Sequence, residues 1–104
     1  MERDTQTKFA ALLRAAAAQK VSEDDFWAQF KDLVDPSSDP IAGIAYETAT
    51  HYWGNFHSRS ILFLIPRKPD RGQLEQGRNE LNLIADALEN ELPVNELERR
   101  LKDV

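Results

Sequence analysis

Cysteine is absent from this 104-residue chain. Its absence excludes disulfide bonds, a thiol nucleophile and any zinc or iron site built on cysteine ligands, and it leaves the redox compartment open. Glycine and proline are scarce, at four and five residues, while hydrophobic residues make up 41% of the chain. This composition predicts a folded globular protein, and the length predicts a single domain over residues 1–104.

Long apolar segments are missing as well. The longest wholly apolar run is Ile61–Ile65, which is far shorter than the ~20 residues needed to cross a bilayer. The N-terminal segment MERDTQTK mixes charges, and Arg14 interrupts the apolar positions that follow it. Because a signal peptide needs an uninterrupted apolar region, we expect none, and we expect a soluble, cytoplasmic protein without membrane contact.

Complete catalytic and metal-binding motifs are also missing. The sequence contains no HExxH, no EF-hand spacing and no GxSxG around a serine. Glu47, His51 and Asn55 fall on one face of a predicted helix. Glu47 and His51 have the spacing of two metal ligands, but the sequence indicates no third ligand. We therefore predict no catalytic residue, no metal and no cofactor, and a minimal enzyme built on these three residues is the alternative.

Hydrophobic periodicity predicts an all-α protein. The expected helices run from Asp4 to Lys20, from Ser22 to Asp35, from Ile41 to about Ser58, from about Arg71 to Glu91, and through the tail VNELERRLKDV. Ile61–Ile65 is compatible with a short strand or with further helix, and helix is favoured because no second strand is available to pair with it.

The expected helix ends carry recognisable capping residues. Ser22 precedes the acidic run of the second helix, Asp39 with the proline after it opens the third, and Asp70 precedes the fourth. Asn95 is a possible cap for the last helix. Gly77 weakens the fourth helix by up to ~1 kcal/mol relative to alanine unless a neighbour packs closely against it.

An aromatic segment, Ile41–Ile65, holds both histidines. We expect a four- or five-helix bundle that packs around it, with Tyr52, Trp53 and Phe56 in the core. The alternative is that part of this aromatic cluster is exposed at an interface, since tryptophan and tyrosine are enriched at binding hot spots. In that case the central helix could pair with a second copy of the chain and give a homodimer.

Negative charge is concentrated in one segment. The whole chain has a net charge of −5, and residues 21–39 contain six acids and one base, so this segment also sums to −5. Such a run can be a solvated face with helix caps, or it can be a docking surface for a basic protein. PRKPDR (66–71) and ERRLK (98–102) are basic, but the overall charge argues against nucleic acid as a partner.

The segment KVSEDDFWAQFKDL, Lys20 to Leu33, resembles the small helical immunity proteins of the colicin D type. The likeness lies in a first helix, a Lys-Val-Ser entry into an acidic second helix, and a late leucine-patterned helix. It implies a cytoplasmic acidic protein without catalysis of its own, which binds and blocks the basic, RNA-cleaving surface of a cognate toxin. Ile41–Ile65 departs from the pattern, because it is apolar and aromatic where further acids are expected.

The sequence therefore predicts an acidic helical module that neutralises a basic protein partner, in particular a toxin nuclease. A homo-oligomeric interaction domain is the alternative. The candidate partner-binding residues are four acids of the second helix region and two tryptophan anchors: Asp24, Asp25, Trp27, Asp32, Asp35 and Trp53.

Overall fold

The computed structural model describes residues 1–61 and 71–103, apart from the side chains of residues 55–61, 71 and 73. Within this part of the chain every regular element is a helix: α1 (Arg3–Ala17), α2 (Glu23–Leu33), α3 (Pro40–Ile61), α4 (Arg71–Glu89) and α5 (Val94–Lys102). The all-α prediction is confirmed for these residues. The predictions for Asp70 and for residues 62–65 fall outside them.

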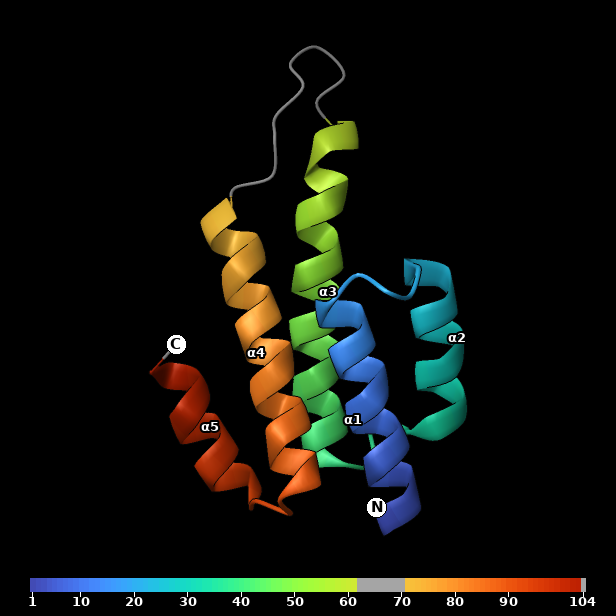
Figure 1. The fold of residues 1–104 in the computed structure, drawn as a ribbon, viewed down its shortest axis with the longest axis vertical. Coiled ribbons are helices and arrows are strands. Elements are labelled where there is room, and N and C mark those ends of the chain that lie inside the picture. The colour runs from blue at the N-terminus through green and yellow to red at the C-terminus, as the bar shows by residue number, and fades with distance from the viewer. Residues whose placement is uncertain (62–70, 104) are drawn as a thin grey trace.

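The helices pack mainly through α4. This helix contacts α1, α3 and α5, and α1 also contacts α2. In Figure 1, α2 and α5 lie on opposite sides of the view, with α1, α3 and α4 between them. The two outer helices therefore meet different neighbours: α5 rests on α4, and α2 rests on α1.

Small residues let α1 and α4 approach each other closely. α1 buries Ala10, Ala16 and Ala17, and α4 buries Ala85 and Ala87. Alanine side chains fill little space between two backbones, so helices that meet through them lie near the short end of the usual interaxial range. The α1–α4 pair indeed has the most extensive contact among the described helices. α1, which buries three alanines, therefore packs most extensively on α4.

Arg14 joins the same two helices at the edge of their contact. Its guanidinium donates from Nε to Glu89 Oε1 at 2.7 Å, from Nη1 to Asn82 Oδ1 at 3.3 Å, and from Nη2 to Asp86. The hydrogen bond from Arg14 lowers the pKa of Glu89 below its usual value. Because all three charged side chains are substantially exposed, each ion pair contributes only about 0–1 kcal/mol.

Tyr52 joins α3 to both α1 and α4. The residue is 1% exposed, and its hydroxyl donates a hydrogen bond to the backbone carbonyl of Ala16 at 3.2 Å. On α4, a Cβ built on Gly77 would lie 2.9 Å from Tyr52 Cδ2. The absence of a side chain at Gly77 is therefore what admits the tyrosine ring, which explains a glycine inside a helix.

Capping at the starts of α2 and α3 follows the sequence, but that of α5 does not. Ser22 Oγ accepts from the backbone N–H of Asp25 at 3.2 Å. Asp39 Oδ1 accepts from the backbone N–H groups of Ile41 and Ala42 at 2.9 and 3.2 Å. The prediction of Asn95 as a cap is wrong, because Pro93 is the N-cap residue and α5 already begins at Val94. Proline holds the extended backbone of that position without a side-chain hydrogen bond.

Replacing Gly77 by alanine should destabilise the protein by about 1 kcal/mol or more, although alanine is favoured over glycine in a helix by about the same amount. The physical reason is the 2.9 Å approach to Tyr52 Cδ2. Urea denaturation measures the change. Gly54→Ala in α3 is the matched control, because no described atom lies within 4 Å of its Cβ position, and it should stabilise the protein. Equal effects of the two substitutions would contradict the packing role of Gly77.

Candidate functional site

The five aspartates of the α2 region divide into two groups by what their side chains do. Asp35 and Asp39 hold the connection between α2 and α3. Asp35 Oδ1 accepts from the Ser37 hydroxyl at 2.6 Å and from the Ser37 N–H at 3.0 Å, and Oδ2 accepts from the Ser38 hydroxyl at 2.9 Å. These donors lower the pKa of Asp35, with the Ser37 hydroxyl contributing most. Asp35 therefore has a structural role in the turn after α2, and Asp39 has one as the cap of α3.

The second group consists of Asp24, Asp25 and Asp32, here called the acidic face of α2. All three are exposed, and no described residue forms an ion pair or hydrogen bond with their carboxylates. Asp24 and Asp25 lie in the first turn of α2, where they also face the positive end of the helix dipole. Asp32 lies at the other end of the helix, so the acidic face has carboxylates at both ends of α2.

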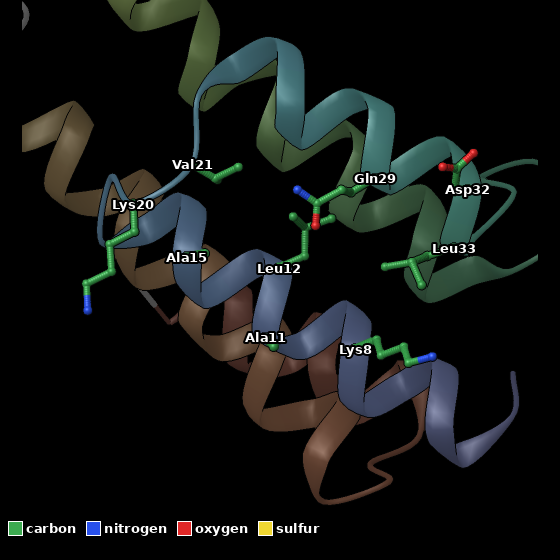
Figure 2. Close-up of a pocket in the computed structure, with 9 residues that line it drawn as sticks. All are labelled: Lys8, Ala11, Leu12, Ala15, Lys20, Val21, Gln29, Asp32 and Leu33. Atoms are coloured by element: carbon green, nitrogen blue, oxygen red, sulfur yellow. The ribbon is translucent and has the colours of Figure 1, made fainter.

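A groove between α1 and α2 adjoins this face. It has a volume of about 520 Å³. Figure 2 shows Leu12, from α1, and Leu33, from α2, reaching into the space between the two helices. Charged residues of both signs also line it: Lys8, Lys20 and Asp32. Asp32 is the one predicted site residue that lines this groove.

Aromatic side chains fill the space between α2 and α3. The ring centroids of Phe26 and Trp53 are 6.1 Å apart, and those of Trp27 and Tyr46 are 5.4 Å apart. Phe30 contributes a further contact, with its centroid 6.1 Å from that of Tyr46. Rings of this size hold two backbones further apart than alanines do. α2 is therefore set off from α3 by a layer of aromatic side chains.

The two predicted tryptophan anchors differ in exposure. Trp53 is 9% exposed and packs against Phe26 and Tyr52. Trp27 is only partly buried, and together with Phe30, Tyr46 and Asp35 it lines a second hollow of about 300 Å³. A partner could therefore reach Trp27 more readily than Trp53.

Tyr46 is the residue of this site that sequence reasoning missed. It is 46% exposed and contacts both Trp27 and Phe30. Its position in the sequence could have identified it, because Tyr46 lies off the apolar stripe of its helix and directly before Glu47. An aromatic residue on the polar side of a helix has no packing role within that stripe, and such residues are enriched where proteins bind each other.

Glu47 and His51 share a third hollow, of about 380 Å³, with Gln76 and Glu80 of α4. The described residues nevertheless contain no group of three acids or histidines able to hold a metal ion. The side chain of Asn55, the third member of the predicted set, lies outside the described part of the chain. Glu47 and His51 are both exposed, so water has open access to this hollow.

Removing the serine donors around Asp35 should raise the pKa of its carboxyl towards the usual value. Because these hydrogen bonds lower the folded-state pKa, they stabilise the turn above the unfolded pKa of about 3.9 and lose that effect as pH falls. The double variant Ser37→Ala/Ser38→Ala should show the higher midpoint in an NMR titration of the Asp35 carboxyl carbon. An unchanged midpoint would contradict the role given to the serines.

Two further findings bear on the nature of the chain. None of the described helices combines the length and the hydropathy that crossing a membrane requires. No protein-family model matches the chain, and no curated protein or solved structure is significantly similar to it.

Proposed function

We propose that the chain is an acidic helical binding module that neutralises a basic protein partner through α2. The observation that carries this proposal is the acidic face: Asp24, Asp25 and Asp32 are exposed, and no described residue pairs with them. The carboxylates of Asp35 and Asp39 accept hydrogen bonds from neighbouring residues of the chain. The acidic face has no such internal role beyond the dipole of the first helical turn.

Electrostatics indicate the class of partner. The net charge of residues 21–39 equals that of the whole chain, −5, so the negative field is concentrated around one helix. Such a field accelerates encounter with a positively charged surface and disfavours wrong partners. Nucleic acids and anionic lipids would be repelled by it. A protein with a basic surface is the partner that this charge distribution fits.

The resemblance of Lys20–Leu33 to colicin D-type immunity proteins suggests a specific form of the proposal. The partner would be a cognate toxin nuclease in the cytoplasm of a bacterium, and this chain would block its basic, RNA-cleaving surface without catalysis of its own. Inhibition would then require only that α2 cover the catalytic surface. Trp27 and Trp53 are the proposed anchors, with Trp27 more accessible than Trp53.

The arrangement of the five helices is also relevant to how α2 is presented. We propose that residues 1–104 act as one domain, a five-helix bundle whose aromatic-rich central element is α3. Tyr52 and Trp53, both buried on α3, support this view, as do the ring contacts between Trp53 and α2. In such a bundle α3 would be the support against which α2 presents its acids.

Self-association through α3 is the alternative proposal. It is motivated by the aromatic content of Ile41–Ile65. Among the described side chains, Tyr52 and Trp53 are already used inside the chain, which leaves Tyr46 as the exposed aromatic of α3. This gives self-association less support than the acidic face gives to binding of a basic protein.

Neutralising the acidic face by Asp24→Asn, Asp25→Asn and Asp32→Asn should slow association with the partner by about tenfold at low salt and flatten the salt dependence of the rate. The partner would first be captured on the immobilised wild-type chain from the host lysate, eluted with salt and identified by mass spectrometry. Stopped-flow fluorescence then gives the association rates, and inhibition of the partner's activity is tested in parallel.

The matched control removes three exposed acids on other helices: Glu47→Gln, Glu75→Gln and Glu98→Gln. It changes the net charge by the same amount but leaves α2 intact. A wild-type rate for the α2 variant, or an equal slowing by both variants, would show that the acidic face is not the docking surface.

The binding proposal and the self-association proposal also differ in oligomeric state. If the chain acts by binding a foreign basic protein, light scattering at micromolar concentration should give the mass of one chain, 11.9 kDa. A mass of two chains that returns to one in Tyr46→Ser would instead favour pairing through α3.

A further inference from the structure

The hollow between the end of α2 and the start of α3 combines aromatic rings with a fixed negative charge. Trp27, Phe30 and Tyr46 contact one another, with ring centroids 5.4 Å apart for Trp27–Phe30 and Trp27–Tyr46, and 6.1 Å apart for Phe30–Tyr46. Together with Asp35 and Lys31 they line a space of about 300 Å³. We call this space the aromatic pocket.

Asp35, which lines the aromatic pocket, has a carboxylate that is oriented and can accept a further hydrogen bond. Ser37 and Ser38 hold Asp35 through three donors, two on Oδ1 and one on Oδ2. A carboxylate offers about four acceptor sites, so Oδ2 can take a further donor. The pocket also lies at the C-terminal end of α2, where the helix dipole is negative and favours a cation.

We propose that the aromatic pocket lodges an arginine side chain of the basic partner, with its guanidinium against the rings of Trp27 and Tyr46 and paired with Asp35. This inference rests on the proposed function and names the group by which the partner is gripped. Arginine fits better than lysine, because its planar guanidinium can stack on an aromatic ring and donate to a carboxylate at the same time.

Charge distinguishes the aromatic pocket from the larger α1–α2 groove. The groove carries two bases, Lys8 and Lys20, against one acid, Asp32, so its lining is net positive and disfavours a cationic side chain. The aromatic pocket carries one acid, Asp35, and one base, Lys31. The positive charge of the Lys31 ammonium would repel an incoming guanidinium. Removing that charge should therefore strengthen arginine binding, whereas removing the charge of Asp35 should weaken it.

The test uses four N-acetylated amino-acid amides, those of arginine, lysine, citrulline and leucine, as probes of the full-length chain. Citrulline is the uncharged counterpart of arginine. Nitrogen-15 NMR follows the indole N–H signals of Trp27 and Trp53, and Trp27→Phe assigns them. The arginine amide should shift the Trp27 signal saturably, with a dissociation constant on the order of millimolar, and citrulline and leucine should bind about tenfold more weakly.

Substitutions in the aromatic pocket should change the dissociation constant of the arginine amide in predictable directions. Asp35→Asn and Tyr46→Leu should each weaken arginine binding about fivefold, while Tyr46→Phe, which keeps the ring, should stay within about twofold of wild type. Lys31→Gln should strengthen it about twofold. Glu98→Gln, on α5, is the matched control for charge and should change the constant by less than about twofold.

Equal binding of citrulline, leucine and arginine would overturn the inference, because it would mean an apolar slot without charge selectivity. So would the absence of a saturable shift at Trp27, or tighter binding after Asp35→Asn. These probes do not involve the partner. Failure of the arginine amide to bind would therefore overturn the pocket inference without affecting the association experiment. Failure of the association experiment would count against the acidic face itself.

Discussion

The fold depends on the contact that Tyr52 makes between three helices. Its ring lies against Gly77 of α4, and its hydroxyl donates to the carbonyl of Ala16 near the end of α1. A hydrogen bond between buried groups contributes only about 1 kcal/mol net, but leaving either partner unpaired in the core would cost more. Because the donor, the acceptor and the space for the ring come from different helices, these helices have one mutual arrangement that satisfies all three.

The two kinds of helix contact in this chain have different consequences for its surface. Alanines bring α1 and α4 together, and Arg14 bridges the edge of their contact. Between α2 and α3, rings take the place of alanines. The aromatic layer holds α2 outward, so its acids face solvent on one side and a hollow opens where the layer ends. The packing of α2 thus also determines which of its side chains are exposed.

The roles of the acids could be separated only partly from the sequence. Ser22 and Asp39 were predicted as caps, and their hydrogen bonds to nearby backbone N–H groups confirm it, because a cap acts within three residues of itself. Asp35 was grouped with the docking acids, yet its carboxylate is held by Ser37 and Ser38. A serine-rich turn can take several conformations, and the sequence does not determine which of them directs both hydroxyls onto the same carboxylate.

The sequence by itself determined the all-α class of the described residues, the approximate helix bounds and the segment that carries the charge, because periodicity, caps and charge runs are local properties. Only the tertiary structure decided that Gly77 receives Tyr52, that Trp53 is buried while Trp27 and Tyr46 border a hollow, and that Asp35 lies at its edge. These contacts depend on which helices pack against each other and on the sizes of the side chains between them. They are made by residues distant in the chain, so a local sequence pattern cannot predict them.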